Sequence, residues 1–228
     1  MLQLDGVGIT QGSFALSANW TVPVGAKVAL IGPSGAGKST LLLALAGFVP
    51  LGAGRVLWDG RDLGPLAPAA RPFSMLFQDQ NLFPHLTVAQ NLGLALAPGL
   101  RLSDAQRLQV AGVLDRLGLA GLGERRPGAL SGGQAGRAAL GRVLLQARPV
   151  LLLDEPFAAL GPGLKADLLA LVADVAAQAT VLMVTHDPAD ARRFADLSVL
   201  VADGVAAAPV ATAALFADPP AALRDYLG

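Results

Sequence analysis

A chain of 228 residues is long enough for one domain with a large buried core, or for one core with an inserted lobe. Its 17 basic and 17 acidic residues give a formal net charge of zero, which argues against a nucleic-acid partner held by a basic field. The absence of cysteine excludes disulfide and thiolate chemistry. The chain starts without a secretory signal, and no apolar run reaches the roughly 18 residues of a membrane span, so we expect it to stay on the side of the membrane where it is made.

The first predicted elements are two short strands, Leu2–Ile9 and Phe14–Trp20. In the second strand, apolar residues recur at every other position, which is typical of a strand with one buried face. Because both strands precede the nucleotide-binding segment described next, we expect them to form an antiparallel flap beside it.

A glycine-rich loop, Gly32–Thr40, lies between the apolar run Val28–Ile31 and the helix-forming run Leu41–Ala46. Strand, glycine-rich loop and helix in this order predict a P-loop, in which inward-turned N–H groups and the helix dipole bind a polyphosphate. Lys38 is expected to reach the outer phosphates, and the Ser39 hydroxyl to bind Mg²⁺. The predicted nucleotide-binding residues are Gly32, Pro33, Ser34, Gly35, Ala36, Gly37, Lys38, Ser39 and Thr40.

The middle of the chain changes from strand patterns to helical ones. From Thr87 to Leu117 the apolar residues follow a helical period, and Ser103 is the predicted N-cap of the second helical segment. The predicted elements are strands at Arg55–Trp58 and Phe73–Phe77, which ends at Gln78, and a helix at Ala138–Ala147.

Strands and helices alternate again after residue 148. Three continuous apolar runs predict buried strands, with helices between them, as in a parallel sheet covered on both faces. The sequence therefore predicts an α/β fold of the P-loop NTPase class, with a mostly parallel sheet (residues 1–80 and 148–228), an antiparallel β flap and an inserted helical lobe (residues 81–147). The predicted strands are Val150–Leu153, Thr180–Thr185 and Leu197–Val201, and the predicted helices are Leu164–Gln178 and Pro188–Phe194.

Polar residues follow three of these strands, at the sheet edge that also holds the P-loop. Asp154 is placed to hold the Mg²⁺ shell, and Glu155, which points the other way, to polarise an attacking water. His186 can reach the γ-phosphate. Gln78 can bridge metal and water. The predicted catalytic residues are thus Glu155, His186 and Gln78, and the predicted metal ligands are Ser39, Gln78 and Asp154.

A second glycine turn, Ser131–Gln134, also opens a helix and so predicts a second phosphate-binding surface. Its predicted nucleotide-binding residues are Ser131, Gly132, Gly133 and Gln134. If both half-sites serve one nucleotide, they must come from different copies of the chain.

Taken in order, these segments resemble the ATP-binding subunits of ABC transporters over nearly the whole chain. The resemblance implies a head-to-tail homodimer with two ATP molecules and Mg²⁺ held between the Walker A motif of one copy and the signature of the other. It also implies that the helical lobe passes the opening and closing of this dimer to transmembrane permease subunits, at the cytoplasmic face of a bacterial inner membrane. The matching residues are Gly32–Thr40 (Walker A), Gln78 (Q-loop), Leu130–Gln134 (signature), Leu151–Asp154 with Glu155 (Walker B and catalytic glutamate) and His186 (H-loop).

Three stretches, Arg71–Gln78, Asn81–Leu94 and Pro98–Leu100, are similar to the ATPase subunit of bacterial thiamine importers. This resemblance implies import of thiamine or thiamine pyrophosphate, with a periplasmic binding protein as an indirect partner. Importers of ferric iron or polyamines use similar ATPases and stay open as alternatives. A soluble ABC-type ATPase of translation or DNA repair is opposed by the neutral charge and the small helical lobe, and a P-loop kinase would leave the signature unexplained.

Two positions depart from the family pattern. Gly161 ends the D-loop segment Ala158–Gly161 where relatives carry aspartate, so a carboxylate expected to act across the dimer is missing. The aromatic residue that stacks on adenine in relatives falls near Gln11, which leaves Phe14, Trp20 or no aromatic residue in that role.

Overall fold

The computed structural model of the chain describes residues 1–79, 81–158 and 160–227. The chain divides into two compact units. Unit 1 comprises Met1–Phe73, Pro149–Glu155 and Gln178–Gly228, and unit 2 comprises Ser74–Arg148 and Pro156–Ala177. The predicted core ranges and the D-loop segment include residues 80, 159 and 228, which lie outside the described residues.

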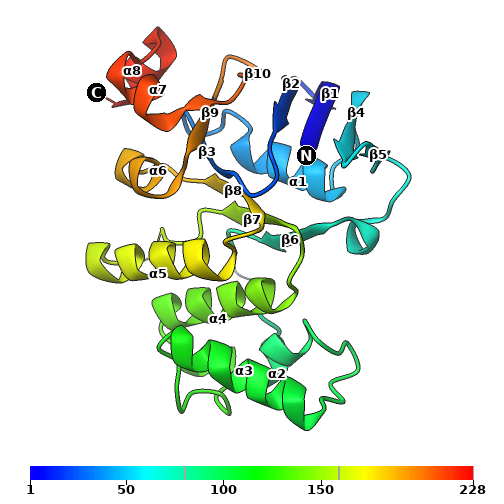
Figure 1. Cartoon of the computed structure of the whole chain (residues 1–228), viewed down its shortest axis with the longest axis vertical. Coiled ribbons are helices and arrows are strands. Elements are labelled where there is room, and N and C mark those ends of the chain that lie inside the picture. The colour runs from blue at the N-terminus through cyan, green and yellow to red at the C-terminus, as the bar shows by residue number, and fades with distance from the viewer. Residues whose placement is uncertain (80, 159, 228) are drawn as a thin grey trace. The chain divides into compact units, whose positions relative to one another are not determined.

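Unit 1 is built on a mixed sheet with the strand order β5-β4-β1-β2-β10-β9-β3-β8-β7, and β11 pairs with β9 (Figure 1). Its strands are β1 (Leu2–Gln11), β2 (Phe14–Val22), β3 (Lys27–Ile31), β4 (Ala53–Trp58), β5 (Arg61–Asp62), β7 (Val150–Asp154), β8 (Thr180–Val184), β9 (Leu197–Ala202), β10 (Val205–Ala206) and β11 (Val210–Ala211). Its helices are α1 (Lys38–Ala46), α6 (Pro188–Phe194), α7 (Thr212–Ala217) and α8 (Ala221–Leu227).

The parallel part of this sheet positions the site. Strands β9, β3, β8 and β7 are parallel neighbours, and every residue of β3, β7 and β8 is buried. Helix α1 packs on β7 and β8, and α6 packs on β3. Because parallel strands bring their carboxyl ends to one edge, the loops after β3, β7 and β8 meet there. The predicted buried parallel strands are confirmed.

The antiparallel flap is also confirmed. Strand β1 pairs antiparallel with β2, with Leu4 opposite Trp20, and antiparallel with β4 on its other side. In β2 buried and exposed residues alternate after the first position, as the sequence predicts for a half-buried strand. Strand β10 runs parallel to β2 and joins the flap to the rest of the sheet.

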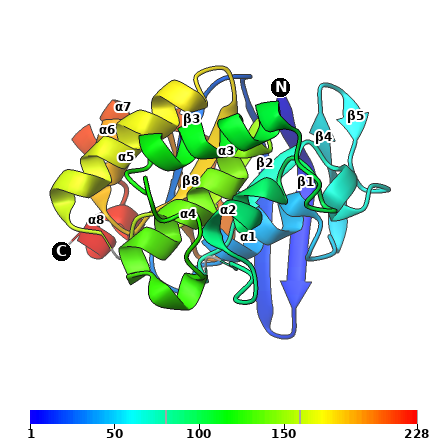
Figure 2. The same ribbon diagram turned by 90° about the horizontal axis from the view of Figure 1, so that it is seen from below.

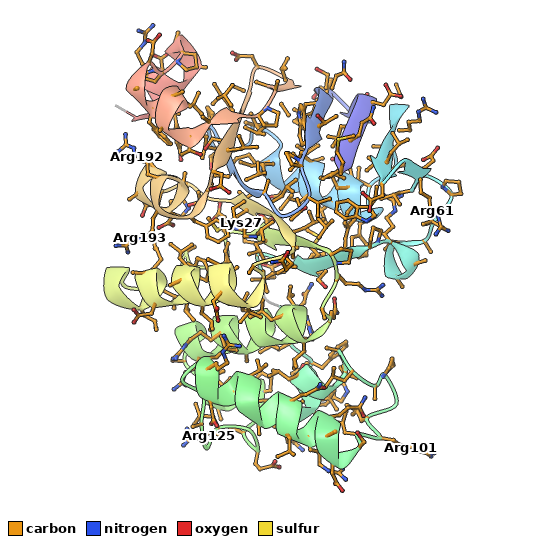
Figure 3. All side chains as sticks on the ribbon, in the orientation of Figure 1. Lys27, Arg61, Arg101, Arg125, Arg192 and Arg193 are labelled. Atoms are coloured by element: carbon orange, nitrogen blue, oxygen red, sulfur yellow. The ribbon has the colours of Figure 1, made fainter. Side chains whose placement is uncertain are left out.

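A buried lysine, Lys27, lies at the start of β3 in unit 1. Lys27 is 8% exposed, and its ammonium group donates to the backbone oxygens of Gly25 and Ala179, at 3.0 and 2.7 Å. Burial lowers the pKa of Lys27, against the opposing charge of Asp196. Figure 3 shows Lys27 among the strands, in contrast to Arg192, which extends from α6.

Unit 2 is mainly helical (Figure 2). Each of its first three helices begins with a capping box, in which a hydroxyl accepts from the backbone N–H three residues on and a glutamine side chain accepts in return. The N-cap residues are Thr87, Ser103 and Ser131, so the prediction for Ser103 is confirmed. The helices are α2 (Val88–Gly93), α3 (Asp104–Arg116), α4 (Gly132–Leu145) and α5 (Pro162–Val175), and strand β6 covers Phe73–Leu76.

Helix α4 begins six residues before the predicted start at Ala138, so that boundary was wrong. The capping box of Ser131 starts the helix, and the glycines that follow do not stop it. Its glycines let it pack closely: a Cβ atom at Gly141 would lie 2.7 Å from Leu117 Cδ1 and 3.1 Å from Leu92 Cδ2. Helix α4 therefore lies against α2 and α3 through a glycine contact.

We predict opposite effects for one substitution at two helical glycines of unit 2. Gly141→Ala should lower the free energy of unfolding by about 1 kcal/mol, because crowding at this contact outweighs the gain in helix propensity. Gly112→Ala in α3, where a Cβ atom would meet nothing within 4 Å, should raise it by about 0.5–1 kcal/mol. Urea unfolding measures both, and a stabilised Gly141→Ala variant would contradict the packing argument.

Candidate functional site

The P-loop follows β3 and is held tightly on two sides. Gly32 has φ 144°, and a Cβ atom there would lie 2.0 Å from the backbone oxygen of Val201 in β9. Gly37 has φ 100°, and a Cβ atom there would lie 2.4 Å from Phe14 Cζ in the flap. Both backbone angles favour glycine, and at Gly32 the contact with the backbone of β9 leaves no room for a side chain. The loop therefore lies directly against β9 and the flap.

Lys38, the first residue of α1, is 7% exposed. Its Nζ donates to the backbone oxygens of Gly32 and Pro33, at 2.8 Å each. Burial lowers the pKa of Lys38, and the carboxylates of Glu155 and Asp154 oppose that shift. Because an ammonium group has three protons, the loop can hold Lys38 with two and direct another at a phosphate oxygen.

The Ser39 hydroxyl donates to Asp154 Oδ1 at 2.9 Å. This hydrogen bond joins the start of α1 to the end of β7, and Asp154 is 4% exposed. Burial raises the pKa of Asp154, while the hydrogen bond from Ser39 and the charge of Lys38 act in the other direction. A hydroxyl and a carboxylate oxygen are the ligands that Mg²⁺ prefers, so this pair fits the predicted metal role.

Within the described residues no group of three or more His, Asp or Glu side chains could hold a metal ion. A cation at Ser39 and Asp154 would therefore need oxygens from a bound phosphate and from water to complete its shell. Such sparse protein ligation is typical of Mg²⁺ that arrives with a nucleotide.

Glu155 follows Asp154 and has φ 47°, in the left-handed region that a side chain rarely adopts. Its backbone N–H donates to the Val184 oxygen of β8 at 3.2 Å. Its Oε2 lies 3.5 Å from Nδ1 of His186, and the two side chains are 24% and 57% exposed. The carboxylate and the imidazole are thus adjacent and open to solvent, beside the buried Asp154.

The structure brings together the P-loop, Asp154, Glu155 and His186 in unit 1, as the sequence predicts for residues at one sheet edge. Gln78 is an exposed residue of unit 2, after β6. Ser131–Gln134 also belongs to unit 2, at the start of α4. There the Gln134 side chain accepts from the Ser131 N–H at 2.9 Å, so it already has a capping role.

The pattern of the ABC transporter family matches residues 16–158, more than half of the chain. The chain belongs to the ABC transporter family.

Relatives within this family are similar over their full length. A protein of Cereibacter sphaeroides named thiamine import ATP-binding protein ThiQ is 66% identical over 100% of both chains. A protein of the same name from Ruegeria sp. is 56% identical, again over 100% of both. A third from Jannaschia sp. is 48% identical over 93% of this chain and 95% of its own.

Solved structures of ABC transporter cassettes share the fold. One is a dimeric post-hydrolysis state of the ATP-binding cassette MJ0796 bound to ADP and Pi, with a TM-score of 0.83 and 27% identity over 93% of this chain. Another, a dimeric structure of MJ0796, has a TM-score of 0.82 and the same identity. Each comparison covers 99% of the solved chain, so the cassette fold is confirmed for the whole domain.

The structure separates the two aromatic candidates for the adenine site of this ABC transporter cassette. Trp20 is buried, and its indole N–H donates to the Ala206 oxygen at 3.1 Å. Phe14 is half-buried and lies against Gly37 of the P-loop. Phe14 thus lies beside the P-loop, whereas the Trp20 side chain is part of the buried core.

Sequence reasoning missed one residue beside the site. The Tyr226 hydroxyl in α8 donates to the backbone oxygen of His186 at 2.6 Å. Tyr226 is the one tyrosine of the chain and lies in an alanine-rich stretch with no motif around it. No sequence signal connected it to the H-loop.

None of the described helices of this ABC transporter cassette has the length and apolar character needed to cross a membrane.

We predict that Asp154→Asn stabilises the nucleotide-free protein at pH 7 but removes its stabilisation by Mg²⁺ and ATP. Burial raises the pKa of Asp154 above its ordinary value of 3.8, so Asp154 favours the folded state only when protonated. The stabilisation that protonated Asp154 gives the folded state is fully present when the pH is below the ordinary pKa. It is lost as the pH rises through the pKa of Asp154 in the folded state. The stability difference between variant and wild type should therefore grow as the pH rises.

Urea unfolding across this pH range measures the difference. Asp218→Asn, at an exposed aspartate, is the matched control and should change neither quantity. A variant less stable than wild type at pH 7 would contradict the prediction.

Proposed function

We propose that this chain binds Mg²⁺ and ATP and hydrolyses the γ-phosphoryl bond by in-line attack of water. The observation that carries the proposal is the hydrogen bond of 2.9 Å between Ser39 and Asp154, because a hydroxyl and a carboxylate beside the P-loop suit Mg²⁺. Lys38 and the inward-turned N–H groups of the loop neutralise phosphate charge. Mg²⁺, when bound, adds positive charge at the phosphate oxygens.

Glu155 polarises the attacking water in this mechanism. Its carboxylate is partly exposed and adjacent to His186, so it is open to a substrate water, whereas the neighbouring Asp154 is buried. His186 orients the water and the γ-phosphate from the other side of Glu155. Gln78, from unit 2, is proposed to bridge the metal and the water. Most of the rate gain comes from positioning and charge neutralisation.

We further propose a head-to-tail homodimer. Unit 2 presents Ser131 and the N-terminus of α4, a helix of 14 residues whose first N–H groups suit an anion. In the dimer Ser131, Gly132 and Gly133 of one copy would close over the phosphates held by the P-loop of the other. The similar MJ0796 cassettes were solved as dimers, which supports a dimer of this chain.

The proposed cargo is thiamine or thiamine pyrophosphate. Relatives of 66% and 56% identity over the full length, both named as thiamine import ATP-binding proteins, support it. The chain would then act at the cytoplasmic face of a bacterial inner membrane, on permease subunits that receive thiamine from a periplasmic binding protein. Ferric iron and polyamines are the alternative cargoes.

We predict that Glu155→Gln keeps ATP binding and loses turnover. Removing the base should lower kcat by at least about 100-fold while the affinity for ATP stays close to that of wild type. Phosphate release and equilibrium nucleotide binding measure the two quantities. Glu124→Gln, the same substitution at an exposed glutamate of unit 2, is the control. Undiminished turnover in Glu155→Gln would remove Glu155 from its role.

We also predict ATP-dependent uptake of thiamine when this chain is combined in vesicles with the permease and periplasmic binding protein of a bacterial thiamine importer. The same vesicles with Glu155→Gln should show no uptake. Labelled ferric iron and labelled spermidine, offered in place of thiamine, should not accumulate. Uptake of ferric iron or spermidine without uptake of thiamine would show that the proposed cargo is wrong, while the proposed ATPase role would stand.

A further inference from the structure

The C-terminal helix α8 follows α7 at the end of unit 1 (Figure 1). A cleft of about 550 Å³ has Asp225 and Tyr226 of α8 on one side and Pro33 and Ser34 of the P-loop on the other. Helix α8 therefore borders the loop that is proposed to hold the phosphates.

Tyr226 makes the direct contact from this helix to the H-loop. Its hydroxyl donates to the backbone oxygen of His186 at 2.6 Å. At the other end of the same peptide group, the N–H of Asp187 donates to Thr185 Oγ1 at 3.1 Å. Because both ends of the peptide are hydrogen-bonded, its plane is fixed, and with it the backbone from which the His186 imidazole projects.

The environment of Tyr226 keeps its hydroxyl a donor. Burial raises the pKa of Tyr226, and the charges of Glu155 and Asp187 raise it further. The phenol therefore stays protonated throughout the neutral range. The influence of Glu155 also places this hydroxyl in the electrostatic field of the proposed catalytic carboxylate.

The His186 imidazole is largely exposed and makes a long contact with Glu155. The His186 side chain is 57% exposed, and its Nδ1 lies 3.5 Å from Glu155 Oε2, longer than a normal hydrogen bond. Its direction thus depends mainly on the backbone beneath it. Thr185 contributes further through its hydroxyl, which donates to Asp190 Oδ2 at 3.2 Å.

We propose that Tyr226 is a positioning residue for ATP hydrolysis: by fixing the peptide group between His186 and Asp187 it aims the imidazole at the reacting phosphate and water. The inference rests on the proposed function. It makes the C-terminal helix a part of the catalytic apparatus.

Tyr226→Phe removes the hydroxyl and keeps the ring. Steady-state hydrolysis by the full chain should show kcat reduced by about 3- to 10-fold, with the KM for ATP unchanged within about twofold. Hydrogen exchange should become faster at the amides of residues 185–190 and stay unchanged elsewhere in unit 1. The control is Arg224→Gln at an exposed position of the same helix, which should leave both measurements as in wild type.

Wild-type turnover in Tyr226→Phe would overturn the proposal. A raised KM with unchanged kcat would also overturn it, because Tyr226 would then act in nucleotide binding. Faster exchange throughout unit 1 together with a lower unfolding midpoint would overturn it as well, because Tyr226 would then contribute only to general stability. If wild type itself hydrolyses no ATP, the proposed function fails instead, and the two failures are thus distinct.

Discussion

The hydrogen bond between Ser39 and Asp154 joins two segments that lie 115 residues apart in the chain. It is possible because β3 and β7 both flank β8 in a parallel sheet and end at the same edge. The P-loop follows β3, and Asp154 and Glu155 lie at the end of β7. Lys38 begins α1 after the P-loop, Glu155 follows β7 and His186 follows β8, so all three lie at this same edge.

This arrangement costs stability at several points. Lys38 and Asp154 are both buried, and desolvation disfavours the charged form of each. Glu155 holds a left-handed backbone angle, which costs of order 1 kcal/mol or more for a residue with a side chain. Buried charge and local strain in one cluster are typical of a site shaped for a ligand. The fully buried leucines and valines of β3, β7 and β8 offset that cost.

Sequence patterns predicted the site residues that lie at strand ends and in glycine-rich loops. The sequence could place the P-loop, Asp154, Glu155 and His186 because the end of an apolar run marks the end of a buried strand. The carboxyl ends of parallel strands then lie at one edge of the sheet. The turn at Ser131–Gln134 was predicted to open a helix, but the range given for that helix, Ala138–Ala147, began too late because glycines have low helix propensity. Trp20 and Phe14 could not be distinguished, since their burial depends on pairing with distant strands. The hydrogen bond from Tyr226 to His186 joins residues 40 apart in the chain, and no periodic pattern in the sequence predicts it.

Helices α2, α3 and α4 all begin with a box closed by glutamine. A glutamate would accept the same N–H bond, but it would bring a full negative charge to the first turn. At α4 the neutral amide starts the helix and leaves the positive end of its dipole uncancelled. The positive end of the α4 dipole would thus attract a phosphate that approaches Ser131, with no carboxylate nearby to repel it. The neutral amide of Gln134 therefore caps the helix and leaves its N-terminus able to bind an anion.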